Sequence, residues 1–310
     1  MRSMLLIANP AASGFNSSTH REVVGILGEA FRVTSVWPDG PEAAEETATR
    51  AAGEGVEVVA AMGGDGIVHR VANALHGSSA VMAVIPAGTT NVFARLTGHP
   101  RSARKTARVL AGSNRIRLLP VARLHAVAGS GSFDRIAVFA AGVGFDAEVI
   151  AESDRRPLKK VGAGAWHYAS SALRTARRFS RRRPELLATV DGETVEAVTL
   201  IAQVGERFTY LGRRSLSLHP AGGPSALAVQ RVDPLRLLRV IAATGLRRSP
   251  DGIAGVNTWH PISSIEVVAQ GPVAFEADGE TFGRVDRLSL EMVPDGLSLL
   301  DPSESGADRD

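Results

Sequence analysis

The sequence predicts a parallel α/β domain followed by an antiparallel β-sandwich, and two observations support this fold class. In the first third of the chain, short apolar runs alternate with segments of helical character, which is typical of a parallel sheet with right-handed crossovers. After about Val121 the pattern changes to many short strand-like runs separated by turn signals, which is typical of a sandwich. The predicted domains are 1–122, which a strand near 290–300 could complete, and 123–289, with a disordered tail over 302–310.

The composition is that of a globular protein. Of its 310 residues 44% are hydrophobic, enough for a sizeable core, and 35 basic side chains stand against 32 acidic ones, so net charge alone indicates no special partner. The absence of cysteine excludes disulfides, thiolate metal sites and cysteine nucleophiles, and we expect a cytoplasmic location. No window approaches the roughly 20 apolar residues of a membrane-spanning helix, so any membrane contact would be peripheral.

Four apolar or β-branched runs in the first domain predict strands that are buried on both faces of a sheet. These runs are Met4–Ala8, Phe31–Trp37, Val56–Met62 and Val81–Pro86. Helices fit between them: Ser17 or Ser18 is the expected cap of one, and Pro41 is the expected first residue of the next.

Three loops follow predicted strands and precede predicted helices: NPAASG at 9–14, GGDG at 63–66 and AGTTN at 87–91. Ligands of parallel sheets bind beyond the carboxyl ends of the strands. Glycines let the backbone approach an anion closely, and the N–H groups at the start of the helix after GGDG suit a phosphate. Asp65 among these glycines is consistent with a divalent cation that offsets its repulsion from phosphate. An ordinary Asp-Gly turn is the alternative for this tetrapeptide taken alone.

Six motifs occur in the order NPAASG, GGDGIVHRVAN, PAGTTNVFARLTG, AAGVGFDAEV, TYLG and FEADGE, and they span almost the whole chain. In these motifs the sequence resembles the diacylglycerol kinase catalytic-domain family, which includes soluble bacterial lipid kinases and sphingosine kinases and is distantly related to NAD kinases and phosphofructokinases. The resemblance implies an ATP- and Mg²⁺-dependent kinase of phospholipid biosynthesis that phosphorylates a lipid hydroxyl, diacylglycerol-like by preference. It also implies that the nucleotide binds between an α/β domain and a larger β-rich domain.

The resemblance implies roles for single residues as well. Asp65 would lie near magnesium, and the expected nucleotide-binding residues are Asn9, Gly63, Gly64, Asp65, Gly66, Gly88, Thr89 and Asn91. Phosphoryl transfer depends on positioning and charge neutralisation, and the glycine-rich loops agree with that need. The sequence departs from the family pattern at several positions: Ile67 and Val92 stand where threonine and aspartate are common, and expected acidic residues are missing within RIRLLPVAR and AGGPSAL. An ATP-binding threonine is also not identified around Val36 and Trp37.

The tetrapeptide DGET occurs twice, at 191–194 and at 278–281. Asp-Gly between strand-like runs is a strong hairpin signal, so the residues alone do not distinguish the two copies. The family resemblance favours the second, because its carboxylate pair lies near the C-terminus and supplies the base that accepts the lipid hydroxyl proton. Asp278 and Glu280 are therefore the expected catalytic residues.

Ten basic residues and no acidic residue lie between Arg155 and Arg183. We expect this stretch to dock on an anionic membrane surface through Arg177, Arg178, Arg181 and Arg182. A solvated arginine face is the alternative, and nucleic acid is not expected because no recognised nucleic-acid motif accompanies the charge. A later helix with Leu235, Leu238 and Ile241 on one side is expected to pack on the sandwich.

Three functions compete at this point. The leading one is a peripheral, membrane-associating lipid kinase, with a homodimer left open. An NAD kinase shares the GGDG motif, although the NPAASG and GTTNVFAR motifs and the distal DGE argue against it. A nucleotide- or lipid-binding protein with weak or no turnover is the third, motivated by the missing acidic residues of the family pattern, such as the one that Val92 replaces.

Overall fold

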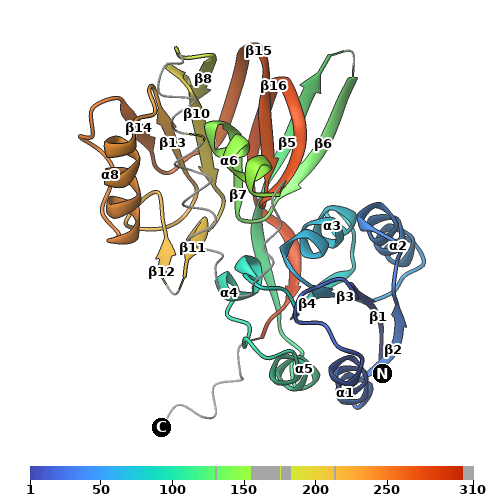
Figure 1. The fold of residues 1–310 in the computed structure, drawn as a ribbon. Coiled ribbons are helices and arrows are strands. Elements are labelled where there is room, and N and C mark those ends of the chain that lie inside the picture. The colour runs from blue at the N-terminus through green and yellow to red at the C-terminus, as the bar shows by residue number, and fades with distance from the viewer. Residues whose placement is uncertain (130, 155–174, 176–182, 213, 303–310) are drawn as a thin grey trace. The chain divides into compact units, whose positions relative to one another are not determined.

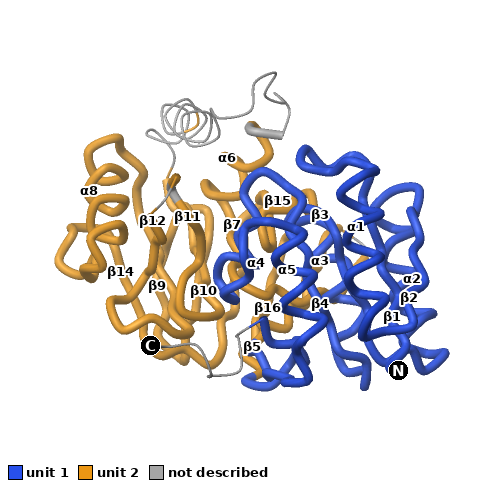
Figure 2. The backbone as a smooth tube through the Cα atoms, turned by 90° about the horizontal axis from the view of Figure 1, so that it is seen from below, with its two compact units in different colours: residues 1–120, 294–310 blue, residues 121–293 orange. Residues whose placement is uncertain are grey.

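The computed structural model describes residues 1–129, 131–154, 175, 183–212 and 214–302. It divides into two compact units, unit 1 with Met1–Pro120 and Pro294–Asp310, and unit 2 with Val121–Val293 (Figure 2). The chain passes between the units within β5 (Ile116–Ala128) and again within β16 (Glu280–Leu300). The boundaries predicted from the sequence lie a few residues from these bounds, and where independently folding domains begin and end stays a prediction.

Unit 1 is built on a parallel sheet with the strand order β4-β3-β1-β2 (Figure 1). The strands are β1 (Arg2–Ala8), β2 (Phe31–Val36), β3 (Val58–Gly63) and β4 (Val81–Pro86), in agreement with the four predicted runs. β3 and β4 are buried along their whole length, as expected of strands covered on both faces. The same prediction was wrong for β2, because it is the edge strand and only its Phe31 is buried. The end of β16 continues the sheet, because Leu299 pairs in parallel with Met82 of β4.

Helices cover both faces of this sheet. α2 (Pro41–Gly53) and α3 (Asp65–Leu75) lie side by side on one face, and α1 (Ser17–Gly28) and α5 (Ala103–Ala111) lie on the other. A short helix, α4 (Val92–Leu96), follows β4. Pro41 begins α2 as predicted, but the expected cap of α1 was wrong: Asn16 is the cap, since its Oδ1 accepts from the backbone N–H of Thr19 at 2.7 Å.

Unit 2 is an antiparallel β structure with the strand order β14-β13-β10-β7-β15-β16. Hairpin β8–β9 adds to β15 and hairpin β5–β6 adds to β16, while β11 and β12 form a separate hairpin. The remaining strands are β6 (Gly131–Ala137), β7 (Ala140–Gly144), β8 (Leu186–Val190), β9 (Glu193–Ala197), β10 (Thr199–Gln203), β11 (Thr209–Leu211), β12 (Arg214–Leu216), β13 (Ser225–Val229), β14 (Val256–Trp259) and β15 (Ser264–Ala277). The predicted class, a parallel α/β unit followed by antiparallel strands, is confirmed.

The long strand β15 joins the two halves of unit 2. Its first half pairs with β8, with Ile265 opposite Val190, and its second half pairs with β7, with Phe275 opposite Val143. Alternate residues of these strands point inward and form one buried core that includes Phe275. Two helices lie against the strands: α6 (Phe145–Asp154) follows β7, and α8 (Pro234–Gly245) lies near β12.

Candidate functional site

The three loops singled out in the sequence meet at the carboxyl ends of the strands of unit 1. Asn9, directly after β1, donates its backbone N–H to Met62 O at 2.9 Å. The backbone N–H of Gly14 donates to Ala87 O at 2.8 Å, and that of Ala87 donates to Gly63 O at 2.8 Å. All three loops are therefore held together by main-chain hydrogen bonds.

Glycine is required where the second and third loops approach each other. A Cβ on Gly88 would stand 2.5 Å from Gly64 Cα, and a Cβ on Gly14 would stand 2.9 Å from Ala87 O. Real Cβ atoms do not approach other atoms so closely, so any larger residue at Gly88 would push the two loops apart. Across the first and third loops, the hydroxyls of Ser13 and Thr89 share a hydrogen bond of 2.7 Å.

The topology places this loop cluster where ligands bind in open parallel sheets. From β1 the chain proceeds to β2 on one side of the sheet, whereas β3 and β4 lie on the other side. The crossover helices on the two sides, α1 and α3, lie on opposite faces. β1 and β3 therefore form the switch point of the sheet, and ligands bind outside the carboxyl ends of the strands at such a point.

Asp65 and Asn91 organise the backbone of the cluster. Both carboxylate oxygens of Asp65 accept from the start of α4, from Val92 N at 2.9 Å and from Phe93 N at 3.0 Å. The amide of Asn91, a residue with φ of 48°, accepts from Gly88 N at 2.9 Å and donates to Gly88 O at 2.7 Å. Asp65 thus joins the start of α3 to the start of α4, and Asn91 closes the third loop.

The N-terminal end of α3 suits an anion. Gly64 is its cap residue and makes no side-chain hydrogen bond to the first turn. The first backbone N–H groups of a helix carry partial positive charge and lack intrahelical partners. Ile67 and Val92, which replace the hydroxyl and the carboxylate of the family pattern, are both buried, and a Cβ on Gly63 would stand 2.6 Å from Ile67 Cγ2. The charge of the cluster therefore comes from helix ends and from Asp65.

A divalent cation would find few protein ligands in unit 1. Across the described part of the chain, no group of three or more His, Asp or Glu side chains is arranged to hold a metal ion. Asp65 is the only acidic residue in the three loops. Mg²⁺ in phosphate sites takes one or two carboxylates and completes its shell with phosphate oxygens and water, and a single Asp65 fits that mode.

The two DGE segments of unit 2 form the same turn. Asp191 and Asp278 have φ of 45° and 54°, and the glycines after them have φ of 91° and 81°, as in a type I′ hairpin. Asp191 accepts from Ser263 N at 3.0 Å and from Ser264 N at 2.8 Å. Asp191 therefore holds its turn against the segment at the start of β15.

The turn at Asp278 differs in its burial. Asp278 is only 2% exposed and accepts from Val138 N at 2.9 Å, Phe139 N at 2.9 Å and Ala140 N at 3.1 Å, whereas Asp191 makes exposed contacts. Glu280, the first residue of β16, is partly exposed. The two expected catalytic residues thus lie on one turn of unit 2, and the expected nucleotide-binding residues lie in unit 1.

Glu276 is a buried acidic residue of this turn that the sequence reasoning did not single out. It is 2% exposed, and its carboxyl oxygen accepts from Gly279 N at 2.9 Å, inside the turn that precedes Glu280. Burial raises the pKa of Glu276 well above its usual value, and the neighbouring carboxyls of Asp146 and Asp278 raise it further. Its signal in the sequence is a glutamate inside the otherwise apolar run VAFEA.

Glu276 and Asp146 converge on a glycine. Gly142 of β7 lies opposite Glu276 of β15, and a Cβ on Gly142 would stand 2.7 Å from Asp146 Oδ2 and 2.7 Å from Glu276 Oε1. Glycine at 142 therefore leaves room for two carboxyl groups at one place. The motif AAGVGFDAEV supplies both Gly142 and Asp146, and this close approach explains the first of its two glycines.

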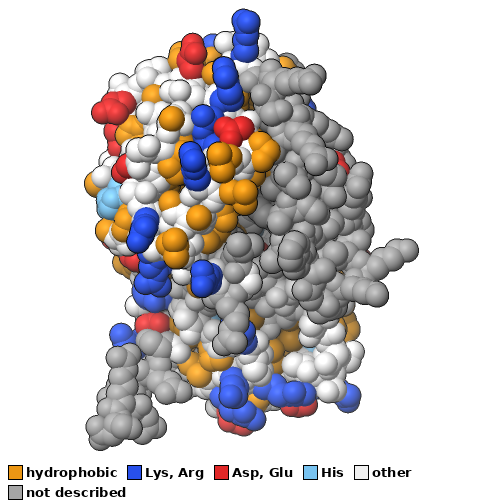
Figure 3. Space-filling model, turned by 60° about the vertical axis from the view of Figure 1, so that its left-hand side comes forward, with side chains coloured by type: hydrophobic (Ala, Val, Ile, Leu, Met, Phe, Trp, Pro, Cys, Tyr) orange, Lys and Arg blue, Asp and Glu red, His pale blue; other side chains and the backbone are white. Residues whose placement is uncertain are grey.

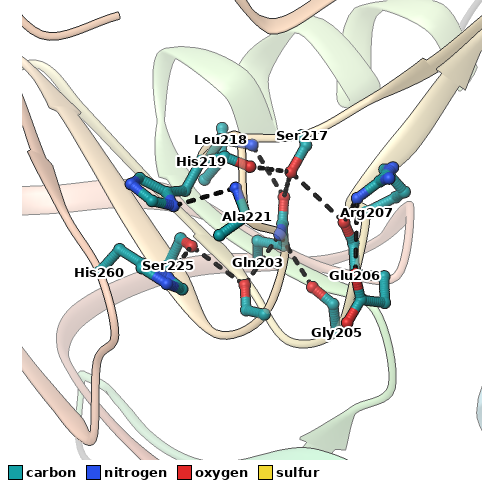
Figure 4. Close-up of polar contacts among 11 residues, drawn as sticks. Gln203, Gly205, Glu206, Arg207, Ser217, Leu218, His219, Ala221, Ser225 and His260 are labelled. Atoms are coloured by element: carbon teal, nitrogen blue, oxygen red, sulfur yellow. Dashed lines mark hydrogen bonds and ion pairs between the residues drawn. The ribbon is translucent and has the colours of Figure 1, made fainter. Parts of the chain in front are cut away.

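A second polar cluster of unit 2 is centred on Gln203, which is fully buried (Figure 4). Its Nε2 donates to Gly205 O and Gly223 O, both at 2.8 Å, and its Oε1 accepts from Leu218 N at 2.8 Å. Ser217 also donates to that oxygen. Because the amide of Gln203 donates to and accepts from the surrounding loops, we interpret this cluster as structural.

The predicted membrane-docking residues Arg177, Arg178, Arg181 and Arg182 lie outside the described residues. Among the described helices, none combines the length and the apolar character that crossing a bilayer requires.

Comparisons with known proteins agree with this geometry. Residues 3–121 match the family model of the diacylglycerol kinase catalytic domain. The chain is 27% identical over 314 residues to a Klebsiella pneumoniae (strain 342) protein named "Probable lipid kinase YegS-like", with 94% of each chain covered. It is 24% identical over 261 residues to the uncharacterized protein sll0036 of Synechocystis sp., with 82% of this chain covered, and it spans 57% of the length of that relative.

Two solved structures share the fold. A diacylglycerol kinase of Bacillus anthracis str. Sterne superposes with a TM-score of 0.69 at 18% identity, and the match covers 97% of each chain. Yeast NADH kinase complexed with NADH superposes with a TM-score of 0.52 at 12% identity, covering 99% of this chain and 85% of that one.

Proposed function

Because residues 3–121 of this chain match the family model of the diacylglycerol kinase catalytic domain, we propose that the protein transfers the γ-phosphoryl group of ATP to the hydroxyl of a lipid. A diacylglycerol-like acceptor is the proposed substrate, and its phosphorylated product would serve phospholipid synthesis. The observation that carries the proposal is the joining of three glycine-bearing loops at the switch point of a parallel sheet, beside the start of α3.

In this proposal unit 1 binds the nucleotide. The backbone of Gly63–Gly66 and Gly88 would line the phosphates, and Asn9, Thr89 and Asn91 would complete the site. Mg²⁺, when bound, would neutralise developing charge on the phosphates, and Asp65 would hold it from the protein side. Asp65 would do so while keeping α4 in place, since it accepts from two backbone amides there.

Glu280 is the proposed general base of unit 2. Asp278 is buried and accepts from three backbone N–H groups, so its contacts hold the turn, whereas Glu280 is partly exposed directly after it. A base has to reach the hydroxyl proton of the acceptor, and partial exposure suits that task. Glu276, through Gly279 N, supports the same turn from inside.

Two other functions have specific support. The likeness to yeast NADH kinase favours phosphorylation of a nicotinamide nucleotide. Val92 at the start of α4, in place of an acidic residue, favours a nucleotide- or lipid-binding protein with little turnover. The assay below separates all three.

The test is label transfer from γ-labelled ATP with Mg²⁺ to bacterial lipids dispersed in detergent micelles, with NAD in parallel. We expect label in the organic extract, and we expect Glu280→Gln to lower kcat by about 100-fold or more, because removing a general base typically costs that much. Glu193→Gln is the matched control, since Glu193 follows the other Asp-Gly turn.

The outcomes are distinct. Label in NADP would support the nicotinamide nucleotide kinase, and tight ATP binding without any labelled product would support the binding protein. Equal loss of activity in Glu280→Gln and Glu193→Gln would remove Glu280 from the mechanism. Titration of ATP binding in each variant shows whether unit 1 still binds the nucleotide.

A further inference from the structure

α8 exposes a row of apolar side chains. Leu235 is 58% exposed, Leu238 64% and Leu246, just past the helix, 58%, and Ala242 is exposed between them. At 100° per residue these four positions fall within an arc of about 80° and extend over about 16 Å along the helix. We call them the α8 stripe.

The stripe is not the side by which α8 packs on unit 2. Leu237 packs against the cluster of Phe145 and Val232, and Val240 packs against the cluster of Leu218 and Leu227. Thr244 is the buried residue of the helix. The prediction that this helix packs on the antiparallel strands is confirmed, but the side predicted to pack was wrong for Leu235 and Leu238. α8 has apolar residues on two sides, and it packs with the side that carries Leu237 and Val240.

Arginines border the stripe. Between Asp233 and Asp251 the chain has four arginines and no acidic residue. Arg236 is engaged with Asp233, with Nη1 to Oδ2 at 3.2 Å. Arg239, Arg247 and Arg248 are exposed, and no ion pair is recorded for them within the described residues. Figure 3, which brings the α8 side forward, shows hydrophobic side chains intermixed with Lys and Arg on this face.

We propose that the α8 stripe docks the protein on an anionic bilayer surface, with Leu235, Leu238 and Leu246 entering the headgroup region and Arg239, Arg247 and Arg248 contacting lipid phosphates. An amphipathic helix with leucines on one side and arginines beside them lies in the plane of such an interface. Arginine can keep its guanidinium among headgroups while its stem covers apolar surface.

The positive charge beside the α8 stripe favours an anionic bilayer over a second copy of the chain as the binding partner. A symmetric pairing of two α8 stripes would bring arginines of two copies together with no carboxylate on the stripe to compensate them, and like charges at an interface oppose association. An anionic bilayer supplies negative charge on every side of the stripe. The purpose of this docking rests on the proposed function, since a lipid kinase meets its acceptor in a membrane.

The test measures binding of the full chain to sedimented vesicles of phosphatidylglycerol and phosphatidylcholine, compared with phosphatidylcholine alone, without ATP. We expect binding to the anionic vesicles that weakens with salt. Leu235→Gln/Leu238→Gln should lower the partition coefficient at least tenfold, and Arg239→Gln/Arg247→Gln/Arg248→Gln should lower it roughly fivefold per arginine removed. The control Leu187→Gln/Val268→Gln removes two exposed apolar side chains of unit 2 outside α8 and should bind normally.

Unchanged vesicle binding in both α8 variants would overturn the proposal. Binding that survives these changes but is lost on charge reversal of Arg177, Arg178, Arg181 and Arg182 would assign docking to that segment instead. A change from dimer to monomer in Leu235→Gln/Leu238→Gln, without loss of vesicle binding, would make the stripe a contact between copies. Kinase activity in detergent micelles, which needs no bilayer, reports separately on the proposed function.

Discussion

Burial of Glu276 makes the stability of the protein depend on pH in a defined direction. The folded state raises the pKa of this carboxyl above its value in the unfolded chain, mainly through burial. The folded state therefore binds the proton more tightly. The stability that neutral Glu276 contributes is fully present below the unfolded pKa and is lost as pH rises through the folded pKa. His99 acts in the opposite direction, because burial lowers its pKa to about 4.

A variant that cannot ionise separates these effects. In Glu276→Gln, an amide oxygen can still accept from Gly279 N, but no charge forms as pH rises. The free energy of unfolding of the variant, relative to that of the unchanged protein, should increase as pH rises above about 4.5, because only the unchanged protein loses stability there. Urea unfolding over a pH series measures this difference, and His99 cancels from it.

Glu266→Gln on the same strand is the control, because Glu266 is exposed. Parallel stability curves for Glu276→Gln and the unchanged protein would show that the Glu276 carboxyl is not held neutral by the fold.

Single residues could be predicted from the sequence where a motif marks them, but not where their role depends on packing between distant strands. Gly63–Gly66 were singled out by a glycine-loop signature, whereas Asp278 and Glu280 were chosen over Asp191 and Glu193 only through the family resemblance, because both Asp-Gly turns have the same local signature. Glu276 became visible only in the structure, because its burial depends on β7 lying opposite β15, a pairing between residues far apart in the chain.

Among the elements, α4 depends on a side chain from another helix. Its cap residue Asn91 makes no side-chain hydrogen bond to the helix, and Asp65 accepts from Val92 N and Phe93 N instead. Asp65→Ala should therefore lower the free energy of unfolding by about 1–2 kcal/mol, the usual cost of a lost cap. Thermal or chemical denaturation without nucleotide or metal measures it.

Asp39→Ala, at an exposed aspartate of the same unit, is the control and should change stability little. If Asp65→Ala leaves stability unchanged, the carboxylate does not hold α4. If it lowers stability, the loss of kinase activity in this variant reports on fold as well as on metal, and Asp65→Asn becomes the better probe of Mg²⁺ binding.

The strands of unit 1 were predictable because their apolar runs are continuous, and β3 and β4 are buried on both faces. α2 was predictable because it begins at a local signal, Pro41. The second half was harder. The run Val195–Ala202 forms two strands, β9 and β10, and α8 packs by Leu237 and Val240 where its amphipathic pattern offered two sides. Local patterns do not specify which of two apolar sides meets a partner.

At the scale of the whole molecule, the end of β16 completes the first unit. Leu297, Leu299 and Leu300 are 2%, 0% and 0% exposed, and Leu300 belongs to the core of the parallel sheet. A chain ending at Val293 would lose these three side chains, each contributing about 1.5–3 kcal/mol by burial.

We expect this truncation to destabilise unit 1 and to speed amide hydrogen exchange in β4, the strand beside which β16 ends. A chain ending at Pro302 keeps every residue of β16 and is the control. Equal exchange in β4 for both truncated chains would show that the last strand is dispensable for the sheet.

The two passages of the chain between the units have a consequence for synthesis on the ribosome. Unit 2 consists of one continuous segment and is complete once Val293 has left the exit tunnel, whereas the sheet of unit 1, begun with β1, waits for the end of β16. Until then the edge of β4 stays unpaired in the nascent chain, and an unpaired edge is a template for aggregation. Unit 1 is therefore begun before unit 2 and completed after it.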